Sequence, residues 1–288
     1  MSDAIRAPLF VPADRPDIFA KAPRSGTDAI ILDLEDAVSR NNKEAARDAL
    51  TCDFTELPVI VRINPPRTPW HAADLAAVAS LQVAGLMLPK SEDPALITDL
   101  AETLGPDVAL LALIESAAGL AAARDIAAVP GVTHLVFGSI DFCADIGAAH
   151  QREVLLPARS ELVLAARLAG ICAPIDGVTA QLDDLTETQA DAAHARALGM
   201  SGKLCIHPRQ VGEVQRAFAP SANEIHWAKR VLASGDGATT VDGAMVDEPV
   251  RLRARAILGA LATAGSHPSA QSERKSEHEG TRACQTRD

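Results

Sequence analysis

The sequence predicts an α/β fold, a (β/α)8 TIM barrel with a C-terminal helical extension. Eight apolar runs of strand length alternate with helical stretches over short connections, which favours a parallel sheet. From the second run onward, each run ends in polar residues, at the edge where the strands of a barrel open onto a site. We expect these residues to share one site: Asp33 to Asp36, Arg62, Lys90, Glu115, Asp141, Asp176 and His207. The 288 residues suffice for one barrel of about 250 residues and an appendage.

The strands are predicted from short apolar runs. The run from Ala29 to Leu32 carries no charge, as a strand buried on both faces requires, and the run PVIVRIN ends in Arg62 and Asn64. The same pattern recurs along the chain as far as GKLCIHP. In chain order we expect strands at 8–12, 29–34, 58–64, 85–90, 108–115, 133–141, 173–176 and 202–208.

The helices are predicted from the stretches between these strands and from their end signals. In the first helix, 14–26, Asp14 is a candidate N-cap, Pro16 lies near the first turn and Gly26 follows the end. A loop is expected after the sixth strand, and the Gly-rich segment 235–243 is expected to form a turn. Further helices are expected at 41–50, 71–80, 93–103, 117–128, 158–169, 181–198, 208–218, 221–234 and 248–262.

These elements divide the chain into three parts. Residues 1–219 form the predicted barrel, which is the catalytic domain, and residues 220–264 form the extension. Residues 265–288 are rich in Ser, Glu, Lys, Arg and Gln without periodicity, so we expect a disordered tail.

Composition excludes several classes of function. The net charge of −11, with no Tyr and only six Phe and two Trp, argues against a nucleic-acid surface. No apolar stretch of about 20 residues exists to span a membrane, and the N-terminus lacks the apolar core of a signal peptide. The five scattered cysteines form no CxxC pair, which favours reduced thiols. We therefore expect a soluble, cytoplasmic protein.

Acidic residues gather at three of the predicted strand ends. Asp33, Glu35 and Asp36 follow the second strand, where they form either the wall of a site or a set of helix caps. Glu115 and Asp141 end consecutive strands, so their carboxylates are expected to converge. Two carboxylates completed by water and substrate oxygens suit Mg²⁺, while a general acid and base pair is the alternative.

Basic residues at strand ends offer further chemistry. Arg62 is suited to clamp a carboxylate or offset charge on a carbonyl oxygen, and it can also pair with Glu35 or Asp36. Lys90 is expected to be ion-paired, with a Schiff base as the alternative. His207 is expected to be a buried, hydrogen-bonded imidazole rather than a base.

The chain also carries a series of motifs that resembles a known family. The motifs are LFVPADRPDIFAKA, DAIILDLEDAV, VRINPPRTPWH, GLMLPKSE, LIESAAGL, FGSIDFCADIG, PIDGV, GKLCIHPRQ and VDGAMVDEPV. In this order they resemble the citrate lyase beta-subunit-like proteins of the HpcH/HpaI aldolase superfamily, which include malyl-CoA and citramalyl-CoA lyases. The resemblance spans about residues 8–260 and is much less specific for the substrate than for the family.

The resemblance implies a role for each of several residues. Glu115 and Asp141 match the Mg²⁺ ligands of the family, and Arg62 matches the arginine that contacts the substrate. Glu35 and Asp36 match acidic residues that hold metal-bound water and that arginine. On the same basis, Asp247 matches an acid/base carboxylate that the extension delivers into a neighbouring subunit's site, usually in a trimer, and weaker candidates on the CoA side are Arg15, Lys21, Ile206 and His207.

The reaction implied is Mg²⁺-dependent carbon–carbon cleavage, or formation, of a 3-hydroxyacyl-CoA. Its partners are an acyl-CoA and a 2-oxo acid such as glyoxylate or pyruvate, and we expect a homo-oligomer, trimeric or hexameric. Ala13 and Ala118 replace a glycine and an arginine that are usual in the family, which leaves the acyl group open. Three alternatives remain: a citrate lyase beta subunit acting on a carrier-protein thioester within a complex, a CoA-independent aldolase, and a non-catalytic scaffold.

Overall fold

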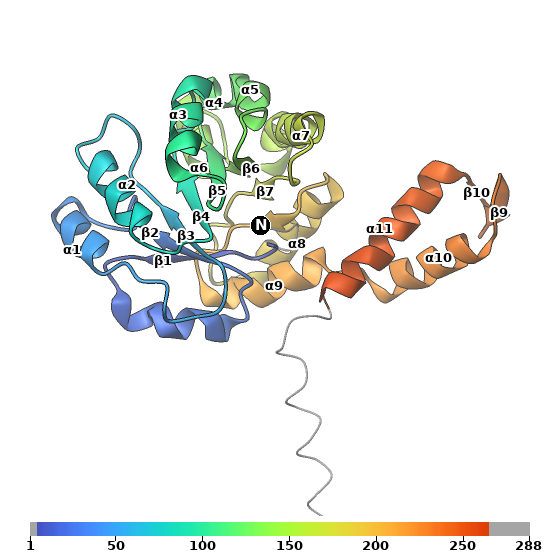
Figure 1. Ribbon diagram of the computed structural model, residues 1–288. Helices are drawn as coiled ribbons and strands as arrows, with labels where there is room; N and C mark the ends of the chain where they lie inside the picture. Colours follow the sequence, from blue (N-terminus) through green and yellow to red (C-terminus); the bar gives the residue numbers. More distant parts are fainter. Residues whose placement is uncertain (1–4, 265–288) are drawn as a thin grey trace, which may run out of the picture. The chain divides into compact units, whose positions relative to one another are not determined.

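The computed structural model describes residues 5–264, which divide into two compact units, Met1–Phe218 and a second that begins at Ala219. The predicted tail, 265–288, lies outside the described residues. The first unit holds an eight-stranded sheet in which each strand pairs in parallel with the next along the chain (Figure 1). Its strands are β1 Leu9–Pro12, β2 Ile30–Asp33, β3 Val59–Arg62, β4 Gly85–Leu88, β5 Ala109–Ile114, β6 Val132–Phe137, β7 Ile175–Asp176 and β8 Gly202–Lys203.

The sheet curls until the segment around β8 meets β1. Leu9 forms a parallel bridge with Cys205, and the backbone N–H of Phe10 donates to the Cys205 carbonyl at 2.9 Å. At Gly202 the chain approaches so closely that a Cβ would lie 2.6 Å from the Arg6 carbonyl oxygen, so a residue without a side chain is required. The segment that follows β8 is thus hydrogen-bonded to β1 through the backbone.

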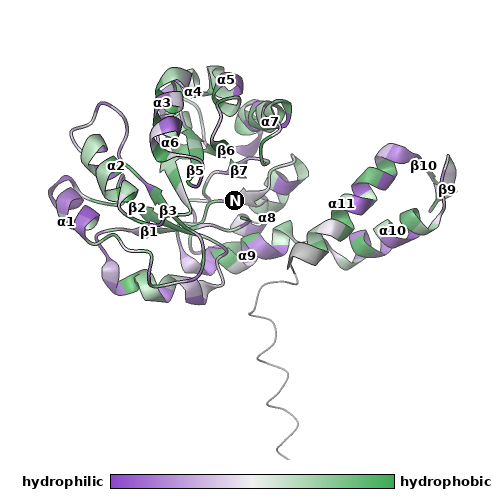
Figure 2. Ribbon diagram, in the orientation of Figure 1, coloured by the Kyte–Doolittle hydropathy of each residue, from purple (hydrophilic) through white to green (hydrophobic). Residues whose placement is uncertain are grey.

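Alternate residues of the strands build two apolar cores. In β2, Ile31 belongs to a cluster that also holds Ile60 and Met87, while Ile30 and Leu32 belong to the larger cluster that includes helix residues. Because successive side chains of a strand point to opposite faces, both faces of the sheet are covered. The apolar parts of the sheet are green in Figure 2, whereas β2, β3, β7 and β8 each end in a charged residue.

Helices lie around the outside of the sheet in Figure 1. Most of them match predicted helices, and their exact bounds differ by a few residues. They are η1 Pro16–Ser25, η2 Arg40–Asn42, α1 Lys43–Asp48, α2 His71–Ala79, α3 Pro94–Leu104, α4 Ala117–Ala121, α5 Ala123–Ala127, α6 Ser139–Ile146, α7 Arg152–Ala169, α8 Leu185–Ala197 and α9 Pro208–Phe218.

The sequence prediction was wrong in the region between the sixth and seventh strands. The sixth strand ends at Phe137, and Asp141 lies in the first turn of α6, where a strand end followed by a loop was expected. Helix α7 begins at Arg152, six residues before the predicted start, and carries Pro157 inside it. Burial of Leu155 and Leu162 on one face of α7 offsets the hydrogen bond that a proline cannot donate.

The first helical stretch also differs from expectation. It is a 3-10 helix, η1, that begins at Pro16 and ends at Gly26, whose φ of 78° is left-handed as predicted for a terminating glycine. Asp14 does not cap it, because its carboxylate instead accepts a hydrogen bond from the side chain of Asn42 at 2.9 Å.

The second unit is a helical hairpin with a small β-hairpin at its turn. Its elements are α10 Ala222–Ala233, β9 Thr239–Val241, β10 Ala244–Val246 and α11 Glu248–Ala264. Ser221 and Glu224 form a reciprocal capping box at the start of α10. Arg251 is buried and donates to the carbonyls of Gly235 and Gly237, which fixes the expected turn against α11.

Two further properties concern the class of protein. In the part of the chain that the structure describes, no helix combines the length and hydrophobicity needed to cross a bilayer. The cysteines described there, Cys52, Cys143, Cys172 and Cys205, are free thiols.

Candidate functional site

A guanidinium and two carboxylates meet at the ends of β2 and β3. Asp33 and Arg62 are the last residues of these strands and are paired in register. Arg62 donates from Nε to Oδ1 of Asp33 at 2.7 Å and from Nη2 to Oδ2 at 2.6 Å. Asp33 also accepts the backbone N–H groups of Glu35 and Ala37, so it holds the turn after β2 as well as the arginine.

Glu35 is the second carboxylate on Arg62. Its Oε2 lies 2.9 Å from Nη1 of Arg62, yet the angle is not that of a hydrogen bond, and this buried oxygen has no hydrogen-bond partner among the residues that the structure describes. Burial is the main cause that raises the pKa of Glu35 to about 8, with Asp36, Glu115 and Asp33 acting in the same direction against Arg62. Glu35 is therefore a carboxyl group poised to exchange a proton near neutral pH.

Arg62 keeps hydrogen-bonding capacity despite these contacts. Among the described residues, one Nε and one Nη2 hydrogen go to Asp33, and one Nη1 hydrogen faces Glu35, which leaves two of the five guanidinium hydrogens for a ligand. The guanidinium carbon lies 4.6 Å from the ring centroid of Phe10 in β1. Its orientation is thus fixed from both sides.

Three charged groups follow β4, β5 and β6. Nζ of Lys90 lies 3.4 Å from Oε1 of Glu115 and 3.5 Å from Oδ1 of Asp141. The side chain of Glu115 is buried, whereas that of Asp141 is 42% exposed, so Asp141 faces the open side of the site. Burial raises the pKa of Glu115 to about 6, and Asp141 adds to the shift while Lys90 and Arg62 oppose it.

The charge network is continuous across these five strands. The charge of Glu115 raises the pKa of Glu35. Burial lowers the pKa of Lys90, but the charges of Glu115, Asp141 and Glu35 outweigh burial and raise this pKa above its usual value. Because parallel strands present their carboxyl ends at one edge, side chains far apart in sequence converge here. The structure therefore places Glu35, Arg62, Glu115 and Asp141 together at one end of the sheet.

The donor set fits a hard cation with oxygen ligands. Gly138 at the end of β6 provides a cradle for Glu115, since a Cβ on it would lie 2.4 Å from Cβ and 2.6 Å from Oε2 of Glu115. Among residues 5–264, no three His, Cys, Asp or Glu side chains come close enough to form a complete cage. Two carboxylates would supply only some of the ligands of such a cation, so water or substrate oxygens would complete its coordination.

Other predicted site residues form no hydrogen bond or ion pair with this network, although the charge of Asp36 contributes to the raised pKa of Glu35. Asp36 is exposed, and no hydrogen bond or ion pair with Arg62 is formed, so the arginine is held by Asp33 and Glu35. Arg15 forms an exposed ion pair with Asp17 at 2.9 Å, and Lys21 is exposed on η1.

The remaining candidates lie at helix ends. Ile206 is exposed, and Nδ1 of His207 accepts the backbone N–H of Arg209 at the start of α9, so the imidazole is partly buried and hydrogen-bonded. Asp247 immediately precedes α11 in the second unit, and its carboxylate accepts the backbone N–H of Val250 in the first turn. These contacts are structural, and they leave the roles given to these residues as predictions.

Sequence reasoning missed the part played by Asp33 and Gly138. The sequence predicts Asp33 only as one member of an acidic cluster. Its pairing with Arg62 could have been predicted, because the two residues end adjacent strands. Gly138 gave no signal, because the demand for a bare backbone comes from the Glu115 side chain of the neighbouring strand.

With this geometry in place, the comparison with known proteins decides the family. Residues 6–208 match the model of the HpcH/HpaI aldolase/citrate lyase family. The chain belongs to this family. Since the matched segment contains both the Arg62 and the Glu115 clusters, the whole charge network lies within the part shared with the HpcH/HpaI family.

Individual relatives cover almost the whole chain. A citrate lyase subunit beta-like protein of Deinococcus radiodurans is 38% identical over 88% of this chain and 96% of its own length. A (3S)-malyl-CoA thioesterase of Cereibacter sphaeroides is 34% identical over 88% of this chain and 93% of its own. The crystal structure of the protein CitE from Mycobacterium tuberculosis in complex with magnesium, acetoacetate and coenzyme A matches with a TM-score of 0.81 at 36% identity, covering 90% of this chain and 98% of that one.

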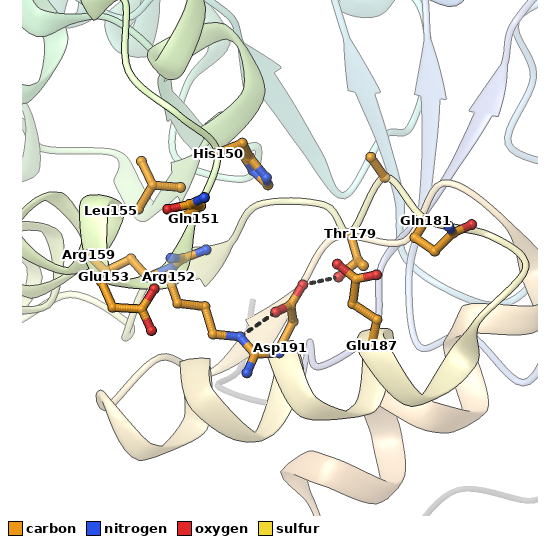
Figure 3. A pocket seen from close by; sticks show the side chains of 11 residues that line it. His150, Gln151, Arg152, Glu153, Leu155, Arg159, Thr179, Gln181, Glu187 and Asp191 are labelled. Atoms are coloured by element: carbon orange, nitrogen blue, oxygen red, sulfur yellow. Dashed lines mark hydrogen bonds and ion pairs between the residues drawn. The ribbon is translucent and has the colours of Figure 1, made fainter.

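A separate polar pocket of about 720 Å³ lies between the start of α7 and the β7–α8 connection (Figure 3). Arg152 on its wall donates to Asp191 at 2.7 Å, and Asp191 in turn accepts the hydroxyl of Thr179 at 2.8 Å. His150, another wall residue, bonds through Nε2 to Ser139 Oγ at 2.9 Å. None of the carboxylates of the charge network lines this pocket.

Behind this pocket lies an ion triad. Asp176, predicted from sequence to share the common site, is fully buried and instead accepts from Nε of Arg159 at 2.8 Å and from Nζ of Lys203 at 3.0 Å. Burial opposes ionisation, but the two cations outweigh it and hold the pKa of Asp176 below its usual range. The residue therefore belongs to the interior of the sheet rather than to the charge network.

Proposed function

We propose that the protein is a Mg²⁺-dependent carbon–carbon lyase that cleaves, or forms, a 3-hydroxyacyl-CoA such as malyl-CoA, citramalyl-CoA or citryl-CoA. The products are an acetyl-CoA-type thioester and a 2-oxo acid. The observation that carries the proposal is the convergence of Arg62, Glu35, Glu115 and Asp141 at one edge of the sheet. Relatives named for citrate lyase and malyl-CoA, and a similar structure holding magnesium, acetoacetate and coenzyme A, support it.

Glu115 and Asp141 are the residues that would hold Mg²⁺. When bound, the ion supplies Lewis acidity for the oxygens of the 2-oxo acid unit. Arg62, with two guanidinium hydrogens left over, binds the same unit and offsets negative charge on its oxygen. Asp33 and Glu35 keep the guanidinium in that position.

The proposed reaction requires two proton transfers. In cleavage a base removes the substrate hydroxyl proton, the carbon–carbon bond breaks to leave the 2-oxo acid, and the thioester enolate takes up a proton. Glu35, with a pKa of about 8 caused mainly by burial, is suited to accept and return a proton near neutral pH. In the condensation direction Asp247 of a neighbouring subunit removes the methyl proton of the thioester.

The proposal includes the architecture and the assembly. The eight strands form a (β/α)8 barrel, and the extension that starts near residue 220 completes the site of a neighbouring subunit in a homo-oligomer. The backbone bonds between Phe10 and Cys205 support closure of the barrel. Coenzyme A lies along the first loop and the segment after β8, near Arg15, Lys21, Ile206 and His207.

The test is a cleavage assay on the purified protein alone with malyl-CoA, citramalyl-CoA and citryl-CoA, with and without Mg²⁺. We expect one of them to yield glyoxylate, pyruvate or oxaloacetate together with acetyl-CoA, and EDTA to abolish turnover. Undiminished turnover in EDTA removes the metal from the scheme. Absence of turnover on all three, with coenzyme A bound, points instead to a partner subunit or to an aldolase substrate without CoA.

Thioester hydrolysis is a second candidate, favoured by the identity of 34% to a (3S)-malyl-CoA thioesterase. The two reactions differ in their products, since hydrolysis of malyl-CoA gives malate and free CoA, whereas cleavage gives glyoxylate and acetyl-CoA. Measuring free thiol together with the 2-oxo acid separates them in a single reaction mixture.

A further inference from the structure

The ammonium group of Lys90 stands between the two carboxylates that are proposed to hold the metal. Its distances to Oε1 of Glu115 and Oδ1 of Asp141 are 3.4 and 3.5 Å, nearly equal. The group therefore occupies the place of a cation and offsets one of the two negative charges.

The backbone at Lys90 is in a conformation that its side chain disfavours. Its φ of 49° is left-handed, a region that glycine adopts freely and that residues with a Cβ adopt only with strain. In this conformation the backbone N–H donates to Oε1 of Glu115 at 2.8 Å, the same oxygen that the ammonium approaches. A glycine at this position would form the same backbone hydrogen bond without strain. The strain therefore arises because the residue is a lysine.

We propose that Lys90 is a tethered counter-ion of the metal site, which withdraws when a divalent cation binds between Glu115 and Asp141. This inference rests on the proposed function. A Mg²⁺ ion lies about 2.0–2.1 Å from its ligand oxygens, and its charge repels an ammonium beside it. The Lys90 side chain is 39% exposed and is free to turn into solvent, while its backbone N–H continues to hold Glu115.

The arrangement selects by charge. A monovalent ion such as K⁺ offers the carboxylates no more charge than the ammonium already does, and it lacks the covalent tether that keeps Lys90 close. A divalent ion doubles the charge and displaces it. Lys90 thus lowers the affinity for Mg²⁺ and in return keeps monovalent ions out of the site.

The experiment is calorimetric titration of Mg²⁺ into the full-length protein, wild type against Lys90→Met. We expect Lys90→Met to bind Mg²⁺ about tenfold more tightly, because no ion contacts have to be broken. In the variant, replacing tetramethylammonium chloride by KCl at equal ionic strength should weaken Mg²⁺ binding, whereas wild type should not respond. Lys90→Arg, which keeps the charge, should remain near wild type.

Arg167→Met is the matched control, since it removes one positive charge from the exposed last turn of α7. Because α7 runs antiparallel to the strands, that turn lies at the opposite edge of the sheet, and Mg²⁺ affinity should not change. Equal or weaker binding by Lys90→Met than by wild type overturns the inference while leaving the metal site intact. No binding by either protein overturns the metal site and the inference with it.

A second measurement needs no variant. The rate at which an acetylating reagent modifies Lys90 in the wild type is followed by mass spectrometry with and without Mg²⁺, and the exposed Lys229 serves as internal standard. We expect Mg²⁺ to increase modification of Lys90 several-fold because the ammonium leaves its ion pairs. A rate that is unchanged or lower, relative to Lys229, contradicts withdrawal.

Discussion

Arg62 and Asp33 end neighbouring strands in register and are joined by two parallel hydrogen bonds of 2.7 and 2.6 Å in a buried setting. We predict that Arg62→Met lowers the free energy of unfolding by about 3–5 kcal/mol, because it leaves a buried carboxylate without its cation. Urea denaturation measures the change. Arg15→Met, which breaks an exposed pair with Asp17, should leave stability as it is. Equal losses in the two variants would refute a special role for the buried pair.

Gly138 is required by the Glu115 side chain. We predict that Gly138→Ala displaces this carboxylate, weakens Mg²⁺ binding at least tenfold and costs about 1–3 kcal/mol of stability, since the added Cβ would lie 2.4 Å from that of Glu115. Calorimetric titration and urea denaturation give the two quantities. In the control Gly212→Ala, within α9, the new Cβ meets only Nη1 of Arg216 at 3.7 Å. That variant should be neutral or up to about 1 kcal/mol more stable.

The raised pKa of Glu35 predicts a pH dependence of stability. Burial raises this pKa from 4.5 to about 8, so between these values the unfolded chain has released a proton that the folded chain retains, and stability falls as pH rises. Glu115 contributes in the same direction only up to about pH 6. Urea denaturation in EDTA should therefore show a decline between pH 6 and 8 that Glu35→Gln flattens. Parallel curves for the two proteins would assign the decline to other groups.

The proposed sharing of sites predicts complementation between two inactive variants. Asp247→Ala and Glu115→Gln should each lose activity when purified alone. If subunits exchange, a mixture in equal amounts should recover about a quarter of wild-type activity, since one in four pairings of a barrel with a neighbouring extension is intact. Exchange is verified with tagged subunits. Persistent inactivity after proven exchange would place Asp247 outside the site.

The order of strands and the edge that carries the site were predictable because both follow from apolar periodicity and parallel connection. The region around α6 was not. The run THLVFGSID reads as one strand, but Gly138 stops it and the backbone turns into a helix whose first turn carries Asp141. At this point Glu115 of the neighbouring strand lies so close to Gly138 that no Cβ would fit, a contact that no local pattern contains.

Within the site, the residue types were easier to predict than their partners. Arg62 was expected beside Glu35 or Asp36; the structure pairs it with Asp33 and Glu35, since the side chain of Asp33 points along the same strand edge and that of Asp36 does not contact Arg62. The expected ion pairing of Lys90 holds, but its left-handed backbone is set by tertiary contacts. The prediction that Asp176 belongs to the common site was wrong, because a position at the end of a strand does not distinguish a residue that faces the site from one in a buried ion triad.

The ion triad of Arg159, Asp176 and Lys203 restricts how this part of the protein can change in evolution. The side chains are 4%, 0% and 1% exposed, and the triad holds two positive charges and one negative. Loss of Asp176 therefore leaves two buried cations without a partner, whereas loss of either cation leaves one ion pair, whose members cannot then be removed one at a time without leaving a buried charge. A lineage that replaces the triad with apolar side chains must therefore cross intermediates that fold poorly, unless several substitutions arise together. Asp176 and at least one of its two cations should therefore be kept or lost together in descendants.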